Sequence, residues 1–87
     1  MRLKLKILYF ASIRERLGRD GEEIDLPPGV STIASLRTHL RARGGAWADV
    51  LAEGRLLRAA VNQDMAQPAA AIKAGDEVAF FPPVTGG

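Results

Sequence analysis

RLKLKILYF, residues 2–10, is the stretch of sequence that decides the fold, because its side chains alternate in character. Every second residue from Leu3 to Tyr9 is apolar or aromatic, whereas the first three residues on the other side of the alternation are charged. Side chains alternate between the two faces of a strand, so the pattern predicts a β-strand with one buried face. On the outer face the charges give way to Leu8 and Phe10, which predicts an apolar area at the end of the strand.

Glycine and proline residues divide the rest of the chain into further regular segments. An apolar stripe of Ile33, Leu36 and Leu40 predicts one main helix, which we expect Ser31 or Thr32 to cap. Gly44-Gly45 ends this helix. The other expected elements are a helical turn at 12–17, a strand at 22–26 that pairs with the first strand as a hairpin, a short amphipathic segment at 47–51, a strand at 56–61, a turn at 62–64 and a strand at 77–81.

The order of these elements, two strands, a long helix and two more strands, predicts an α+β fold. In this fold the main helix packs across one face of a mixed sheet, with short helical turns beside it, which is the β-grasp or ubiquitin-like arrangement. A chain of 87 residues has room for a single core. We therefore expect one β-grasp domain at residues 1–81 and a flexible, extended C-terminal tail at residues 82–87.

Composition excludes several classes of function. The chain has no cysteine, which removes disulfides, thiolate zinc sites and thiol nucleophiles, and we expect no bound metal. A net charge of +2, with basic and acidic residues interspersed, is too small an excess to indicate nucleic-acid binding. No apolar run approaches the roughly 20 residues that span a bilayer, and the charged N-terminus does not resemble a signal peptide. The sequence predicts a cytoplasmic protein with no nucleic-acid or membrane partner.

The C-terminal tail carries the most distinctive chemistry. Pro82-Pro83 favours a stiff, extended backbone, so the chain should leave the last strand in a defined direction. Gly86 and Gly87 lack a Cβ and can pass through a channel that excludes other residues. The Gly87 α-carboxylate is ionised at neutral pH and is a poor electrophile until it is activated. We expect Gly87 to be the reactive site and Gly86 to give it passage. The alternative is a pair of disordered glycines with no function.

Three stretches give the chain a resemblance to a known family. They are GDEVAFFPPVTGG at residues 75–87, Tyr9-Phe10-Ala11 with Arg14-Glu15 after the first strand, and AVNQ at residues 60–63. Together they resemble the small subunits of molybdopterin synthase, which are ubiquitin-like sulfur carriers of molybdenum cofactor biosynthesis. The resemblance extends over the whole chain, and the run FFPPVTGG is far more specific than a terminal Gly-Gly alone.

The resemblance implies a cycle of reactions at Gly87. An adenylyltransferase similar to ubiquitin-activating enzymes uses ATP and Mg²⁺ to adenylate the Gly87 carboxylate, and a sulfur donor then displaces AMP to leave a thiocarboxylate. The tail next enters the large, catalytic subunit, where sulfur passes to cyclic pyranopterin monophosphate to build the molybdopterin dithiolene. A dithiolene needs two sulfurs and hence two charged carriers, and the resemblance implies a 2:2 heterotetramer in the synthase. This chain binds no cofactor itself and acts as the sulfur-donor subunit rather than as the catalyst.

An apolar surface near the tail is the expected docking site for both partners. Leu8, Phe10 and Phe81 should share the outer face of the sheet, and the family places an apolar contact residue at Met65. We predict that each partner in turn contacts Phe10, Met65 and Phe81. The alternative is that the core buries some of these side chains. We also predict that the partners bind the first tail residues, Pro82, Pro83, Val84 and Thr85.

Other polar and aromatic side chains fit structural roles better than chemical ones. His39 lies on the main helix without a recognisable partner, so a surface position is expected rather than catalysis. Arg37, Arg41 and Arg43 are expected to form a solvated helix face, with phosphate or nucleic-acid binding as the alternative. Trp47 is expected to anchor the core.

Three competing functions stay open at this point. A sulfur carrier of another pathway, such as thiamin biosynthesis, would share the Gly87 chemistry and use another acceptor. A ubiquitin-type modifier would form isopeptide bonds with lysines of other proteins. A small binding domain with an inert tail would instead show salt-dependent binding through its arginines.

Overall fold

The computed structural model describes residues 4–83, and the alternating N-terminal stretch forms its first strand. β1 runs over Leu5–Tyr9, and its inward side chains Leu5, Ile7 and Tyr9 are at most 1% exposed. The alternation predicted from the sequence is therefore confirmed. The other elements, in chain order, are α1 (Ala11–Leu17), β2 (Gly21–Ile24), α2 (Ile33–Arg41), α3 (Gly45–Val50), β3 (Arg58–Val61), β4 (Asp64–Ala66) and β5 (Glu77–Phe81).

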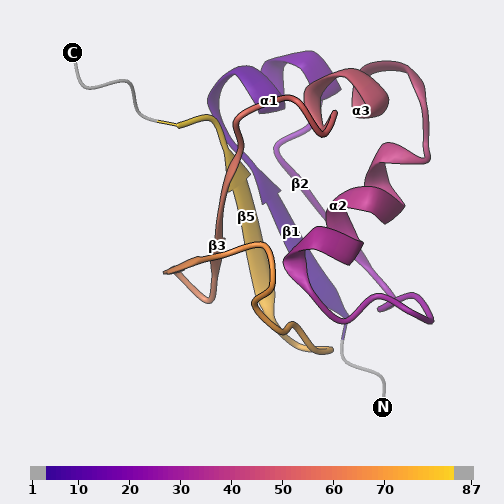
Figure 1. Cartoon of the computed structure of the whole chain (residues 1–87), viewed down its shortest axis with the longest axis vertical. Helices are drawn as coiled ribbons and strands as arrows, with labels where there is room; N and C mark the ends of the chain where they lie inside the picture. Colours follow the sequence, from indigo (N-terminus) through magenta and orange to yellow (C-terminus); the bar gives the residue numbers. More distant parts are fainter. Residues whose placement is uncertain (1–3, 84–87) are drawn as a thin grey trace.

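The strands form one mixed sheet in the order β2-β1-β5-β3-β4. β1 and β5 are parallel, whereas the β1–β2, β3–β5 and β3–β4 pairs are antiparallel. α2 packs across one face of the sheet, and α1 and α3 lie near the end of the sheet at which β5 finishes (Figure 1). This is the β-grasp arrangement that the order of elements predicted.

α2 forms where the sequence predicts because its first turn is capped and one of its stripes is apolar. Thr32 Oγ1 accepts a hydrogen bond from the Ser35 N–H at 3.1 Å, and Ser35 Oγ accepts one from the Thr32 N–H at 2.9 Å. This reciprocal capping box satisfies N–H groups that a helix start leaves without partners. The stripe of Ile33, Leu36 and Leu40 is at most 5% exposed and joins the core. Within residues 4–83, no helix is long and apolar enough to cross a membrane.

The hairpin after β3 corrects the prediction of only four strands. Asn62 and Gln63 have positive φ angles of 50° and 72° and form a two-residue turn. Asp64, predicted to belong to that turn, instead begins β4, which pairs with β3. The three residues of β4 include no β-branched side chain, so its pairing with β3 is what defines it. At the other end of β3, Leu56 and Leu57 precede the strand rather than open it.

The Glu22 carboxylate on β2 holds together three parts of the molecule. Its Oε2 accepts hydrogen bonds from Tyr9 Oη at 2.7 Å and Arg43 Nη1 at 2.8 Å, and its Oε1 accepts one from Arg43 Nη2 at 3.0 Å. The Arg43 guanidinium also lies 4.3 Å from the centre of the Trp47 ring. Arg43 is exposed, as predicted, but it follows α2 rather than lying on the helix face, and it makes these contacts. Trp47 packs against the edge of the core and stays partly exposed.

We expect the Glu22 interactions to make stability depend on pH. Burial raises the pKa of Glu22, but hydrogen bonds from Arg43 and Tyr9 outweigh it and hold the pKa below its usual value. A lowered pKa contributes stability above the unfolded-state pKa, and this contribution is lost as the pH falls through the folded-state pKa. Glu22→Gln should therefore lower the free energy of unfolding by roughly 1 kcal/mol at pH 7. The difference from the parent should shrink below about pH 4, near the model-peptide value for Glu.

Urea unfolding between pH 3 and pH 7 measures this difference. The matched control is Glu23→Gln, which removes the same charge from the exposed neighbouring position on β2. A Glu22→Gln deficit that stays constant over the whole pH range would contradict the prediction.

Candidate functional site

β5 carries the chain to one end of the sheet, where Pro82 and Pro83 follow (Figure 1). β5 lies between β1 and β3, so both of its edges are hydrogen-bonded. Pro82 and Pro83 are half-buried. The predicted site residues that follow them, Val84, Thr85, Gly86 and Gly87, lie outside the described residues.

The start of β5 is held by a polar network around Asp76. This residue is 5% exposed, and its carboxylate accepts hydrogen bonds from the Lys73 N–H at 2.9 Å and from Asn62 Nδ2 at 3.1 Å. Burial raises the pKa of Asp76, but the hydrogen bonds from Asn62 and Lys73 outweigh it and lower the pKa overall. Asn62 Oδ1 in turn accepts the Glu77 N–H at 2.9 Å. These bonds tie the β3–β4 turn to the first residue of β5, so the start of the strand is held in place.

The register of the sheet brings an apolar row together on the outer face, away from α2. Leu8 lies opposite Ala79, Ala79 opposite Ala60, and Ala60 opposite Met65. Phe81 is two residues beyond Ala79 and therefore shares the face with it. Alternate β5 side chains, Val78 and Phe80, are fully buried on the opposite face.

The three predicted docking residues are all accessible in this chain. Phe10 is 43% exposed and Met65 is 62% exposed, while Phe81 is half-buried. Phe10 and Leu8 line a shallow hollow of about 570 Å³ on the same side of β1. The alternative in which the core buries these side chains is therefore wrong, and their contact with partners stays a prediction.

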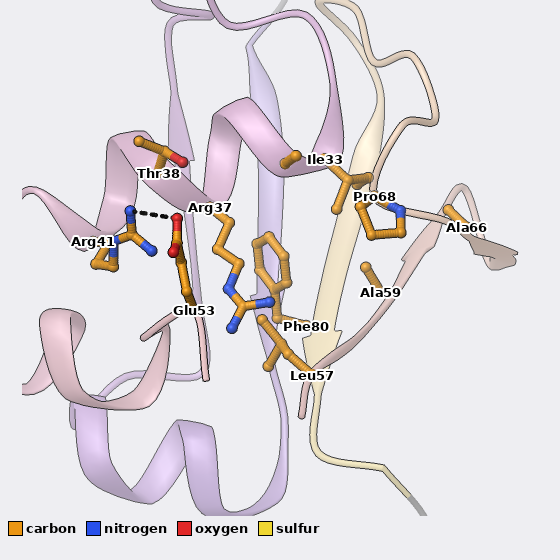
Figure 2. Close-up of a pocket in the computed structure, with 11 residues that line it drawn as sticks. Ile33, Arg37, Thr38, Arg41, Glu53, Leu57, Ala59, Ala66, Pro68 and Phe80 are labelled. Atoms are coloured by element: carbon orange, nitrogen blue, oxygen red, sulfur yellow. Dashed lines mark ion pairs between the residues drawn. The ribbon is translucent and has the colours of Figure 1, made fainter. Parts of the chain in front are cut away.

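Arg37 has a structural role that the sequence did not indicate. It reaches from α2 toward the segment before β3 (Figure 2), where its Nε donates to the Leu51 carbonyl at 2.9 Å and its Nη2 donates to the Arg55 carbonyl at 3.0 Å. Nη2 also donates to the Ala52 carbonyl. The prediction of a solvated helix face is thus wrong for Arg37. By contrast, His39 is exposed and its side chain makes no hydrogen bond or ion pair with residues 4–83, as expected for a surface position.

A separate hollow of about 180 Å³ lies between α2 and the β3–β4 hairpin (Figure 2). Its lining includes Leu57, Ala59 and Phe80, and at its mouth Arg41 pairs with Glu53 at 3.6 Å. Neither Pro82 nor Pro83 lines this hollow. It adjoins a second hollow that Pro83 does line, and the two share Leu57, Ala59, Ala66 and Pro68.

The comparisons with known proteins agree with this geometry. The model of the ThiS family matches residues 7–87, from within β1 to Gly87. This chain belongs to the ThiS family. The ThiS-family chain is 47% identical over 85 residues to the molybdopterin synthase sulfur carrier subunit of Escherichia coli (strain K12), with 95% of this chain and 99% of the relative covered. The resemblance found in the sequence is thus confirmed.

Solved structures of similar fold include two with related names. The putative molybdopterin converting factor subunit 1 of Pyrococcus furiosus is 29% identical, has a TM-score of 0.74, and is matched over 94% of this chain and 99% of its own. A protein–protein complex of subunits 1 and 2 of the molybdopterin-converting factor of Helicobacter pylori 26695 contains a chain with a TM-score of 0.63. That chain is 20% identical over 98% of this ThiS-family chain and 100% of its own, a likeness of fold alone.

Proposed function

We propose that this chain is the sulfur carrier subunit of a molybdopterin synthase, with sulfur carried as a thiocarboxylate on Gly87. The observation that carries the proposal is the 47% identity, over nearly the full length of both chains, to a protein of that name. The family match extends to Gly87 itself, so the tail is included in the likeness. The position of β5 supports the same role, because the tail follows directly from the end of this central strand.

The first step of the proposed cycle activates the Gly87 carboxylate. One carboxylate oxygen attacks the α-phosphorus of ATP in the activating enzyme, which forms an acyl-adenylate and releases pyrophosphate. A hydrosulfide equivalent from a sulfur donor then adds to the acyl carbon, and the bond to AMP breaks as the carbon–sulfur bond forms. The resulting thiocarboxylate is anionic and nucleophilic at neutral pH, so this chain does not need to provide a side-chain base.

The second step delivers sulfur within the large subunit. The thiocarboxylate sulfur forms a bond to a carbon of cyclic pyranopterin monophosphate as a carbon–oxygen bond at that carbon breaks. Water then attacks the Gly87 acyl carbon, whose bond to sulfur breaks, so that the sulfur stays on the pterin and the Gly87 carboxylate is restored. Two such deliveries are needed for one dithiolene, which is consistent with a 2:2 heterotetramer. The residues that bind and protonate the pterin belong to the large subunit in this scheme.

This chain contributes positioning and docking to the cycle. Phe10, Met65 and Phe81 present apolar surface on the face and end of the sheet from which the tail leaves. The activating enzyme and the large subunit both act on Gly87, so they bind the same end of the molecule in turn.

Mass spectrometry of the intact chain tests the carrier function. After incubation with the activating enzyme, ATP, Mg²⁺ and a sulfur source, the C-terminal peptide should gain the mass that replaces one oxygen with sulfur. The thiocarboxylated chain, mixed with the large subunit and cyclic pyranopterin monophosphate, should then yield molybdopterin. If the terminal peptide keeps its mass in the presence of an activating enzyme that is active on its own carrier, the proposal is wrong.

The same experiment separates the competing functions. A thiocarboxylate that forms but yields no molybdopterin would indicate a sulfur carrier of another pathway. Isopeptide conjugates on lysines of other proteins would indicate a modifier.

A further inference from the structure

Leu56 is the most exposed large apolar residue among those that the structure describes, at 80% exposure. It lies in the segment between α3 and β3, and this segment is well supported. Arg37 donates hydrogen bonds to carbonyls on both sides of Gly54, at Ala52 and Arg55. The Arg55 guanidinium also pairs with Asp49 on α3 at 3.1 Å. Leu56 is therefore exposed on a segment that hydrogen bonds hold in place. Its apolar surface can be removed from water when another molecule covers it.

Two hollows flank Leu56 at the root of the tail. One, of about 160 Å³, lies on the α1 and α3 side and is lined by Leu56, Leu57 and Pro82 together with residues of both helices. The other, of about 320 Å³, lies on the β3–β4 side and is lined by Leu56, Leu57 and Pro83 together with Met65. Leu56 and Leu57 thus form an apolar ridge between two depressions, and each depression contacts one of the two tail prolines.

The charge around this ridge is basic. Arg16, Arg55 and Arg58 line the two hollows, whereas Glu15 is the only acidic residue among the described residues that line them. Asp49 pairs with both Arg16 and Arg55. Arg58 is exposed, and within residues 4–83 its guanidinium makes no ion pair or hydrogen bond.

The tail is so short that a protein acting on Gly87 must come close to Pro83. Gly87 is four residues beyond Pro83, and four extended residues span about 14 Å at most. A protein that encloses the Gly87 carboxylate in an active site must therefore bring its surface close to Pro83. The ridge and the two hollows surround that point, so they must meet the rim of the enclosing site.

We propose that Arg55, Leu56, Leu57 and Arg58, together with Pro82 and Pro83, form a tail collar that docks onto the rim of the large subunit's channel. The fitting partner surface has apolar side chains that fill the two hollows and carboxylates that face Arg58. This proposal rests on the proposed function. It extends the docking surface from the outer face of the sheet around the tail to the segment before β3.

Binding of the full-length variants to the purified large subunit tests the tail collar. Leu56→Ser should weaken binding at least about tenfold, because it removes a leucine that becomes buried on docking. Arg58→Glu should weaken binding about five- to tenfold at low salt, with a smaller effect in 0.5 M NaCl, because added salt screens charges at a rim. The matched control is Lys4→Glu, which makes the same change in net charge at the opposite end of β1, where Lys4 is exposed, and should bind like the parent.

The outcomes separate this inference from the proposed function. If the parent chain does not bind the large subunit, the proposed function fails. If the parent binds and both Leu56→Ser and Arg58→Glu bind as tightly as the parent does, the proposal of a tail collar is wrong, while the proposed carrier function stands. Tighter binding by Leu56→Ser, or loss of a parent dimer seen in sedimentation, would show that the chain's own tail or a second copy occupies the collar. Thermal unfolding should be unchanged in Leu56→Ser, since this side chain is 80% exposed.

Discussion

Removal of Gly87 should abolish thiocarboxylate formation and molybdopterin synthesis without changing the free energy of unfolding. The hydrophobic core consists of residues from Leu5 to Phe80, so stability does not depend on the last residue. The shortened chain still ends in a glycine carboxylate, now on Gly86, but its reach from Pro83 is shorter by one residue, which is about 3.5 Å of extended chain. Misplacement of a reacting group by about 1 Å can cost about a hundredfold in rate, so a full residue should reduce turnover at least that much.

Two further variants separate the effect of tail length on activity from the effect of side-chain width. Gly87→Ala keeps the length and adds one Cβ, so its activity should fall only to the extent that the partner's channel is narrow. A single glycine added after Gly87 keeps the width and moves the carboxylate outward. Thiocarboxylate yield by intact mass and molybdopterin yield report on the two partners separately, and urea unfolding checks the fold. Full activity in both the shortened and the lengthened chain would overturn the assignment of Gly87.

Phe80→Ala should mainly reduce stability and Phe81→Ala should mainly reduce partner binding, although the two residues are neighbours on β5. Phe80 is 0% exposed and packs in the core, so its truncation leaves a cavity and should cost about 3 to 5 kcal/mol. Domains of this size are commonly stable by only 5 to 15 kcal/mol, so this loss can unfold a large fraction of the chain. Phe81 is half-buried on the outer face, and its truncation should cost about 1 kcal/mol.

Binding reverses the order of the two variants. At a temperature where both are folded, Phe81→Ala should bind the activating enzyme and the large subunit at least about tenfold more weakly, because it removes an apolar contact residue. Phe80→Ala should bind nearly as the parent does once its unfolded fraction is taken into account. Urea unfolding and calorimetric titration measure the two effects. Equal loss of stability in both variants would mean that Phe81 is a core residue, and unchanged affinity in Phe81→Ala would remove it from the docking surface.

The interpretation of Met65 depends on both the sequence and the tertiary structure. Its likeness to a family contact position came from the sequence. Its place opposite Ala60, in a row that continues to Leu8, came from pairing within the sheet. β4 itself was missed because its three residues carry no strand pattern of their own. Hydrogen bonds to β3 define this edge strand, and a sequence pattern does not record which partner a short segment will find.

The contacts of two arginine side chains were also not predictable from the sequence. Arg37 and Arg43 were predicted to be solvated because they flank an apolar helical stripe. Arg37 instead bonds carbonyls of the segment before β3, and Arg43 holds the Glu22 carboxylate on β2. A long side chain can reach a partner far away in the sequence, and composition gives no sign of which carbonyl or carboxylate will be within reach.

The sequence by itself determined the buried face of β1, the cap and stripe of α2, the β-grasp order and the likeness of the Gly86-Gly87 tail to that of sulfur carriers. Each of these depends on spacing within a few residues or on a contiguous motif, so it is readable along the chain. Only the tertiary structure decided what surrounds the tail at Pro82 and Pro83. The braced Leu56 segment, the exposed Arg58 and the hollows beside them are brought to that place by contacts among α2, α3 and the sheet, and such contacts exist only in the folded chain.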